Sequence, residues 1–190
     1  MGSVGFKEWA VVGEALGRGE QTILLRKGGI AEGREGFSFR SPEFLLFPTF
    51  FHEQIEKVRA PVNAVPVQRA GEIELKFFAR LECAANITDW EVAAKLEPFH
   101  ILLPEVVRER FEYEAAPGIH AAFVRIFRLA PTWIVPDLPS YGGCRSWVKL
   151  PDLPEPIQLT PVLSDAESGR SLRAFREIVA DAAPVLAPAS

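Results

Sequence analysis

The sequence predicts an α+β fold built around a β-rich core. Residues 72–85 alternate apolar and polar side chains over a length typical of a long core strand. Short apolar runs flanked by glycine or proline, at 22–26 and 44–47, predict further strands. Helix-capping sequences that begin at residues 88 and 164 predict helices. With 48% hydrophobic residues, including fourteen Phe, the chain can fill one substantial core.

The first third of the chain is expected to alternate helices and strands. Residues 6–17 carry apolar side chains at helical spacing and predict an amphipathic helix, with a strand as the alternative. A buried strand at 22–26 follows, and the glycine-rich stretch 28–42 predicts a loop. After the next strand, Thr49 is placed to cap a short helix that runs through about residue 58.

The middle of the chain is expected to hold two helices and a second core strand. Residues 88–91 read Thr-Asp-Trp-Glu, a capping box that predicts a helix over 89–98. A helix over 104–113 is predicted because its first residue is proline, which suits a first helical turn. A strand is expected at 120–129, with 133–135 pairing beside it.

The C-terminal part is expected to be irregular chain that ends in a helix. Residues 136–162 are rich in proline and glycine and predict one strand only, at 145–150. Residues 164–167 form a second capping box, which predicts a helix with a narrow apolar stripe. That stripe consists of Leu172, Phe175 and Val179. We therefore expect one domain over residues 1–150, and a proline-rich connection and a helix over 151–190.

Composition limits the class of protein. No stretch approaches the eighteen apolar residues that cross a bilayer, and Lys7 and Glu8 interrupt any signal-peptide core, so we expect a cytoplasmic protein without membrane contact. Cys83 and Cys144 belong to no CxxC or Cys/His cluster, which predicts reduced, mostly buried thiols and no metal or cofactor. The net charge of −4 argues against a broadly basic nucleic-acid binder, although most of it falls in residues 151–190.

Two groups of cations are candidates for contacts with nucleic acid. Arg26 and Lys27 end a predicted strand before two glycines, so their charge and exposed backbone N–H groups can meet a phosphate. The alternative is a turn with solvated cations. Tyr141 and Trp147 bracket a glycine turn that contains Arg145, which predicts a platform for stacking a base, with core packing as the alternative.

A nuclease-like pattern and the histidines are the other candidates for chemistry. Glu74 and Lys76 match the Glu-x-Lys half of nuclease cores, with Glu43 as the upstream acid, and a solvent-facing strand edge as the alternative. The histidines share no metal-ligand spacing and are expected to be structural or surface residues. They are His52, His100 and His120.

Several strings of residues carry a resemblance to a known family. They are Lys7–Val12, Leu24–Ile30, Phe44–Thr49 and Tyr141–Trp147. Together they resemble an uncharacterised bacterial family, the domain-of-unknown-function family numbered 1802, over roughly residues 6–150. Because its members are said to occur with restriction-endonuclease domains, the resemblance implies a place in restriction–modification or DNA surveillance.

The order of predicted elements also resembles the ASCH and EVE members of the PUA-like β-barrels. This resemblance implies a small mixed barrel with flanking helices that binds RNA or modified bases in a cleft near the first helix and strand. The matching polar positions are Thr22, Arg26, Lys27 and Thr49. ASCH domains usually carry a Lys just before this strand, where this chain has Glu20 and Gln21, so a hydrolase role is not implied.

The leading functional hypothesis is a noncatalytic module that binds DNA, RNA or a modified base. The residues expected to make contact are Thr22, Arg26, Lys27, Thr49, Tyr141, Arg145 and Trp147. One alternative is a metal-dependent nuclease or nucleotide hydrolase that uses Glu43, Glu74 and Lys76. A further alternative is a protein-interaction domain whose C-terminal helix exposes its apolar stripe to a partner.

Overall fold

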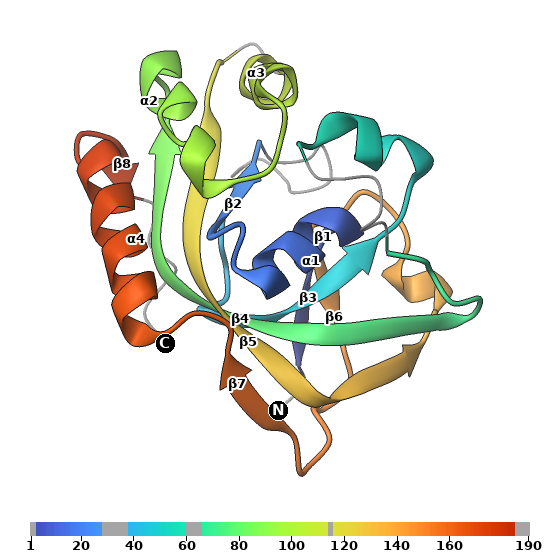
Figure 1. Ribbon diagram of the computed structural model, residues 1–190. Coiled ribbons are helices and arrows are strands. Elements are labelled where there is room, and N and C mark those ends of the chain that lie inside the picture. The colour runs from blue at the N-terminus through green and yellow to red at the C-terminus, as the bar shows by residue number, and fades with distance from the viewer. Residues whose placement is uncertain (1–2, 28–37, 60–65, 114–115, 185–190) are drawn as a thin grey trace.

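The computed structural model describes residues 3–27, 38–59, 66–113 and 116–184, and the α+β class is confirmed (Figure 1). In these residues eight strands form one mixed sheet. The strands are β1 (Val4–Trp9), β2 (Ile23–Arg26), β3 (Glu43–Thr49), β4 (Glu72–Ile87), β5 (Ile119–Pro136), β6 (Trp147–Lys149), β7 (Gln158–Pro161) and β8 (Ala183–Pro184). The main order is β2-β5-β4-β3-β1-β6, with β7 added to β5 and β8 to β4.

The sheet is strongly curled but open, so the predicted closed barrel is not confirmed. Within the described ranges its path ends at β2 on one side and at β6 on the other, and these two strands do not pair. The curl comes from the long strands β4 and β5, whose register shifts between Leu75 and Phe77 and again between Leu81 and Cys83. Such bulges bend a strand and increase its twist.

Helices pack around this curled sheet. They are α1 (Ala10–Arg18), α2 (Trp90–Ala94), α3 (Pro104–Glu112) and α4 (Asp165–Ile178), with short 3-10 turns η2 (His52–Lys57), η4 (Glu97–Phe99) and η5 (Pro139–Tyr141). Figure 1 shows α1 lying inside the curve of the sheet, whereas α4 runs along the bent part of β4 and β5. No helix in the described part of the chain is long and apolar enough to span a membrane.

The N-terminal segment differs from the predicted helix over 6–17. Residues 6–9 belong to the strand β1, which pairs in parallel with β3 and antiparallel with β6, whereas residues 10–17 belong to the helix α1 as predicted. The apolar pattern fits a helix and a strand equally well, and the segment forms a strand because it pairs with β3 and β6. The same pairing corrects the role of Thr49, which ends β3 beside Trp9 instead of capping a helix, and its hydroxyl donates to the carbonyl oxygen of Glu8 (3.0 Å).

The predicted core strands are confirmed, with one change in connectivity. Strand β4 buries Ile73, Leu75, Phe77 and Ala79 on one face, as the alternation indicates. The segments 120–129 and 133–135 do not lie beside each other, because both belong to the single strand β5, whose later part pairs with the start of β4. Strand β6 matches the prediction, and β7 was not predicted.

The capping sequences locate the helices to within about one residue. At the first, Asp89 and not Thr88 is the N-cap, since the Glu91 N–H donates to Asp89 Oδ1 (2.8 Å), and α2 ends earlier than predicted, at Ala94. At α4 the capping box is complete, because Ser164 and Glu167 each accept the other's backbone N–H. The helix α3 begins at its proline, as predicted.

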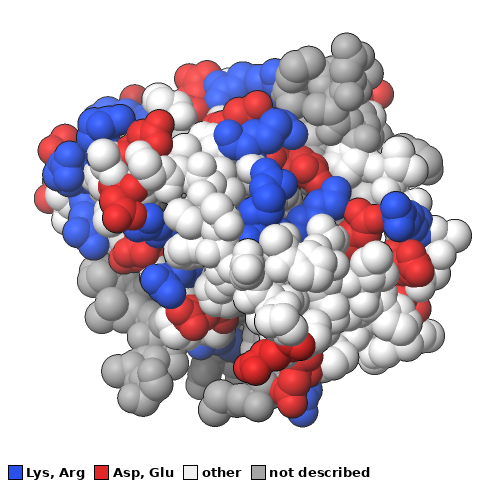
Figure 2. Space-filling model, turned by 60° about the horizontal axis from the view of Figure 1, so that its bottom comes forward, with Lys and Arg blue, Asp and Glu red and all other residues white. Residues whose placement is uncertain are grey.

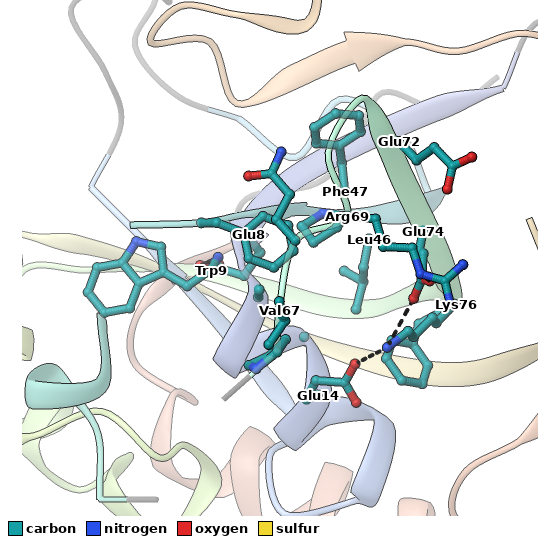
Figure 3. Close-up of a pocket in the computed structure, with 17 residues that line it drawn as sticks. Glu8, Trp9, Glu14, Leu46, Phe47, Val67, Arg69, Glu72, Glu74 and Lys76 are labelled. Carbon is teal, nitrogen blue, oxygen red and sulfur yellow. Dashed lines mark hydrogen bonds and ion pairs between the residues drawn. The ribbon is translucent and has the colours of Figure 1, made fainter. Parts of the chain in front are cut away.

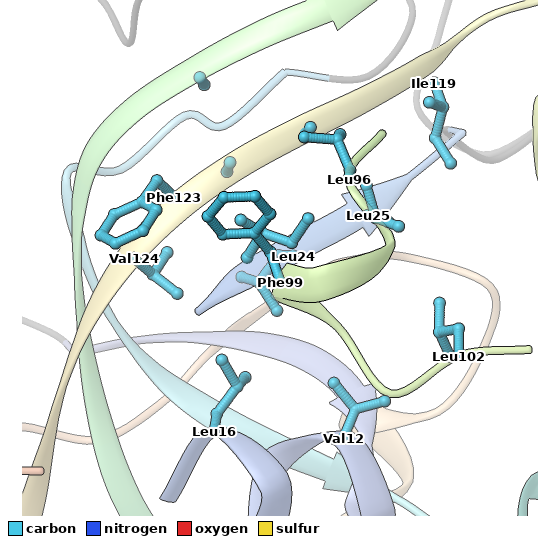
Figure 4. Close-up of a cluster of buried hydrophobic side chains, with 14 of the residues drawn as sticks. Val12, Leu16, Leu24, Leu25, Leu96, Phe99, Leu102, Ile119, Phe123 and Val124 are labelled. Atoms are coloured by element: carbon cyan, nitrogen blue, oxygen red, sulfur yellow. The ribbon is translucent and has the colours of Figure 1, made fainter. Parts of the chain in front are cut away.

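Two hydrophobic cores lie on the sheet. The larger core joins α1, β2 and β5 to the segment around η4, and Figure 4 shows Val12 and Leu16 rising from α1 toward the side chains of these strands. The smaller core includes Leu45, Leu75 and Val148. The tail helix packs on the larger core, with Phe175 and Val179 buried and Leu172 partly buried against it. The exposed apolar stripe that the protein-interaction alternative requires is therefore not present on α4.

Two glycines in α1 predict opposite effects of substitution by alanine. A Cβ at Gly17 would lie 2.0 Å from Phe77 Cζ, whereas a Cβ at Gly13 would have no neighbour within 4 Å. Gly17→Ala is expected to lower the free energy of unfolding by about 1–3 kcal/mol through overpacking. Gly13→Ala is expected to raise it by up to about 1 kcal/mol, because alanine favours the helix. Urea denaturation measures the free energy of unfolding of both variants. Equal changes in the two variants would contradict the difference in packing around Gly17 and Gly13.

Candidate nucleic-acid interface

A hollow with basic walls lies between the end of β2, η2 and α3, and we call it the basic hollow. It has a volume of about 700 Å³, including the solvent at its mouth. Its charged lining residues are Arg26, Lys27, Lys57, Arg110 and Glu109, and Trp9 and Tyr113 supply aromatic surface. Among the described residues, four cations from three segments of the chain thus face one space together with a single carboxylate. Such a group favours an anion.

The two arginines of the basic hollow are held by carbonyl oxygens and by aromatic rings. Arg26 Nη2 donates to the carbonyl oxygen of Lys7, and its guanidinium lies 4.8 Å from the centre of the Phe6 ring. Its Nε is buried and has no hydrogen-bond partner among the described residues. Arg110 Nη1 donates to the carbonyl oxygen of Leu25 (3.0 Å). These contacts fix both guanidinium groups before any ligand arrives.

The two lysines of the basic hollow differ in how they are held. Lys27 Nζ donates to the carbonyl oxygens of Ala116 (2.7 Å) and Phe111 (3.3 Å), which ties the end of β2 to the end of α3. Lys57 is half-buried, and its ammonium has no hydrogen bond or ion pair with the residues that the structure describes. Of the four cations in the basic hollow, Lys57 is therefore the one whose charge the described residues compensate least.

A second pocket lies between α1, the end of β3 and the start of β4, and we call it the Glu8 pocket (Figure 3). Its volume is about 520 Å³, including the solvent at its mouth. Leu46, Phe47 and Phe77 supply an apolar lining. The charged side chains around it are Glu8, Glu14, Glu72, Glu74, Arg69 and Lys76. Carboxylates outnumber cations here, the reverse of the basic hollow.

An ion-pair network forms one wall of the Glu8 pocket. Lys76 Nζ lies 2.8 Å from Glu14 Oε1 and 3.5 Å from Glu74 Oε2, and Arg69 Nε lies 3.0 Å from Glu74 Oε1. Figure 3 shows Lys76 between the two carboxylates. Burial acts to lower the pKa of Lys76, but Glu14 and Glu74 outweigh it, so that the pKa is raised. Lys76 is a charged structural partner of these acids.

The geometry that the nuclease hypothesis requires is not present. Glu43 pairs with Arg80 at 3.0 Å, and Arg80 stands six residues further along β4 than Glu74. At the usual rise of a strand this separates Glu43 from Glu74 by about 20 Å. The acid that was expected to complete the Glu-x-Lys pattern therefore cannot share a metal ion with it.

Trp9 lies between the basic hollow and the Glu8 pocket and lines both. The Arg110 guanidinium lies 4.4 Å from the centre of its ring, and Phe51 meets it edge-on at 4.9 Å. Glu8, the neighbour of Trp9, is buried with 3% of its surface exposed. Burial lowers the pKa of Arg110, and the Glu8 carboxylate opposes that shift. The acidic and basic sites are thus electrostatically coupled.

The two aromatic residues of the predicted platform differ in how far they are buried. The Tyr141 ring is buried and lies 5.3 Å from that of Phe47, and Trp147 packs 4.9 Å from Phe6 in a group of aromatic rings. The Tyr141 ring therefore offers no open face for stacking, whereas Trp147 is partly exposed and lines a hollow together with Arg145. Arg145 is exposed beside them, far along the chain from β2, and together with burial it lowers the pKa of Lys7.

The structure unites only part of the predicted contact set. Arg26 and Lys27 lie together in the basic hollow. Thr22 is buried before the opposite end of β2, where its N–H donates to the carbonyl oxygen of Phe99 (3.0 Å). Thr49, Tyr141, Arg145 and Trp147 do not line that hollow. The sequence reasoning missed Lys57, Arg110 and Trp9, which no local motif connects to the end of β2.

The histidines and cysteines lie in different environments. His100 is buried, and its Nδ1 accepts from the Leu102 N–H (3.2 Å), as expected of a structural histidine. His120 lies on β5 opposite Arg26, and the side chain of His52 is outside the described part. Both cysteines are free; Cys83 is partly buried, but Cys144 is exposed, so the expectation of a buried thiol is wrong there.

Comparison with known proteins places the chain in a family. A family model described as a domain of unknown function, DUF1802, matches residues 5–173, which extends past the expected limit of 150 into α4. A crystal structure of an ASCH mutant protein from Zymomonas mobilis is similar at a TM-score of 0.43 and 14% identity, over 91% of this chain and 95% of that one. The structure of ASCH from the same organism gives 0.42 and 13%, over 90% and 94%. No curated protein matches the sequence. The chain belongs to the DUF1802 family of domains of unknown function.

Proposed function

We propose that this protein is a noncatalytic nucleic-acid-binding module whose basic hollow binds the phosphates of a DNA or RNA strand. The observation that carries the proposal is the convergence of Arg26, Lys27, Lys57 and Arg110 on one open space. Arginine and lysine side chains are common partners of phosphate oxygens in protein–nucleic-acid complexes. The fixed guanidinium groups place positive charge at the basic hollow, and the lysines add to it.

The charge distribution supports a local contact over a broad electrostatic one. The net charge is −4, and on the face in Figure 2 basic and acidic side chains alternate without forming a large field of one sign. A protein that tracks a long stretch of backbone needs an extended positive groove. We therefore propose recognition of one or two nucleotides at the basic hollow. The place in restriction–modification that the family resemblance implies belongs to the same proposal, and probes with modified bases test it.

Lys57→Glu is the variant that tests the proposal most directly, because the protein supplies no partner for this ammonium among the described residues. Reversing a charge about 4 Å from a phosphate changes the interaction by about 2 kcal/mol in water, so the Kd for a single strand should rise at least about tenfold. The slope of log K against log salt should fall by about 0.7 per lost contact. Fluorescence anisotropy with labelled DNA and RNA, plain and base-modified, measures both quantities.

Lys95→Glu is the matched control, since it makes the same change in net charge at an exposed position after α2. Its Kd and salt slope should stay within about a factor of two of the unmodified protein. If Lys57→Glu and Lys95→Glu lost equal affinity, the loss would come from the change in net charge alone. The basic hollow would then no longer be the proposed binding site. Absence of saturable binding to every probe would reject the function itself.

A further inference from the structure

The helix α1 contains a glycine for which the protein's own packing gives no reason. Glycine is the poorest helix former after proline, so a glycine inside a helix calls for an explanation. Gly17 has one, because a side chain there would strike the Phe77 ring. Gly13 has none of this kind, since a Cβ there would meet no atom within 4 Å. Gly13 lines the Glu8 pocket, and its missing side chain keeps that pocket open.

The Glu8 pocket combines apolar surface with hydrogen-bond acceptors. Glu14 and Glu74 are occupied by the ion-pair network, whereas Glu72 makes no ion pair within the described residues. The buried carboxylate of Glu8 accepts the N–H of Trp9 (2.8 Å) on Oε1, and no described residue donates to Oε2. Oε2 is not fully enclosed by the protein, so a molecule in the pocket can donate a hydrogen bond to it. The pocket therefore suits an apolar ring that carries N–H groups.

The position of the Glu8 pocket beside the basic hollow indicates what kind of molecule carries such a ring. The two spaces meet at Trp9, and Glu8 on one side interacts electrostatically with Arg110 on the other. A nucleotide has the same two parts, a flat base and a phosphate. Adenine, cytosine and guanine carry an exocyclic amino group with two N–H donors, whereas thymine and uracil carry only the ring N3–H, which is flanked by two carbonyl acceptors that carboxylates repel. Carboxylates accept from such amino groups.

We infer that the Glu8 pocket receives the base of the nucleotide whose phosphate binds in the basic hollow, and that it selects a base with an exocyclic amino group, such as adenine or cytosine, over thymine or uracil. The inference rests on the proposed function for the phosphate, but the selection of the base depends on different residues. Glu8 and Glu72 supply the acceptors, Phe47 and Phe77 contact the ring, and Gly13 leaves the space. Trp9 separates the base from the phosphate site.

Homopolymeric single strands and a plugged pocket test the inference. The native protein should bind oligo(dA) or oligo(dC), and their RNA counterparts, at least about tenfold more tightly than oligo(dT) or oligo(U), in line with a base contact. Gly13→Leu should fill the pocket and reduce this ratio to about one without changing the salt slope. Gly169→Leu is the matched control, because it puts the same side chain into α4, where a Cβ has only Arg173 within 4 Å. The control should keep the native ratio.

Glu8→Gln tests whether the Glu8 carboxylate selects the base, without filling the Glu8 pocket. Glutamine can still accept the Trp9 N–H, but it presents an NH₂ donor where the carboxylate had a free acceptor. The preference should then shift toward thymine and uracil by about tenfold. Thermal unfolding of each variant establishes that it is folded. Unchanged base ratios in folded Gly13→Leu and Glu8→Gln would overturn the inference.

Nucleosides distinguish failure of the inference from failure of the proposed function, because they carry no phosphate. Adenosine and cytidine should shift amide resonances of residues around the Glu8 pocket in a ¹H–¹⁵N NMR titration, and uridine should not. If Lys57→Glu weakens all strands but neither nucleoside binds and all homopolymers bind equally, the proposed function stands and the inference fails. If nucleosides bind selectively and Lys57→Glu has no effect, the inference about the base stands and the basic hollow is not the phosphate site.

Discussion

Replacing Phe175 with alanine should lower the free energy of unfolding by about 3–5 kcal/mol, the usual cost of removing a fully buried aromatic side chain. Phe175 has 0% of its surface exposed, and its ring lies 5.8 Å from that of Phe123 and 6.1 Å from that of Phe99. The helix α4 thus closes one side of the larger core, although it follows the proline-rich stretch. Urea denaturation followed by tryptophan fluorescence measures the change.

Arg176→Ala is the control for Phe175→Ala, because it alters the next residue of the same helix on its exposed side. An exposed substitution of this kind usually changes stability by no more than about 0.5 kcal/mol. If Phe175→Ala cost less than about 1 kcal/mol, the helix would be only loosely docked. The apolar stripe would then be accessible to a partner, and the protein-interaction hypothesis would return.

The elements that could be predicted from the sequence are those that local chemistry determines. Ser164 and Glu167 cap α4 through groups three residues apart, so four letters of sequence suffice to locate its start. The alternation over 72–85 is likewise a property of one segment, and β4 follows from it. The tail helix was predicted, but whether its stripe would be buried depended on Phe123 and Phe99, to which no local pattern refers.

The elements that could not be predicted depend on partners distant in sequence. The segment Val4–Trp9 is a strand because β3 and β6 lie on either side of it, although its apolar spacing also suits a helix. Strand β7 lies in a stretch whose prolines indicate irregular chain, and it forms because β5 offers an edge. Intrinsic preferences of a few residues are regularly outweighed by such tertiary pairing.

In the candidate site too, some residues could be predicted from local sequence and others are brought in only by packing. Arg26 and Lys27 were predicted because a strand that ends in two cations and two glycines is a local feature. Lys57, Arg110 and Trp9 join them only through the packing of η2 and α3 on β1 and β2. Tyr141 and Trp147 were predicted as a stacking platform because they bracket a glycine turn that contains Arg145; Tyr141 is buried, whereas Trp147 is partly exposed beside Arg145. Residue type thus predicted that the site is basic, but it did not predict which residues form it.

The second large effect that we expect is a loss of stability in acid that depends on His100. Burial, and then the positive charges of Arg59 and Arg110, lower the pKa of His100 from 6.5 to about 4. Between these values the unfolded chain binds a proton that the folded chain does not, so stability falls as the pH falls from 6.5 toward 4. The loss from this group should reach about 3 kcal/mol near pH 4, and none is expected above pH 7.

His100→Asn isolates that contribution from the carboxylates that also titrate in acid. An asparagine oxygen can accept the Leu102 N–H as Nδ1 does, but it takes up no proton in this range. Free energies of unfolding from urea denaturation at pH 7, 6, 5 and 4.5 should therefore fall less steeply in the variant. Because only the slopes are compared, a uniform loss of stability in the variant does not affect the test. Parallel slopes in both proteins would show that His100 is protonated as easily in the folded chain as in the unfolded one.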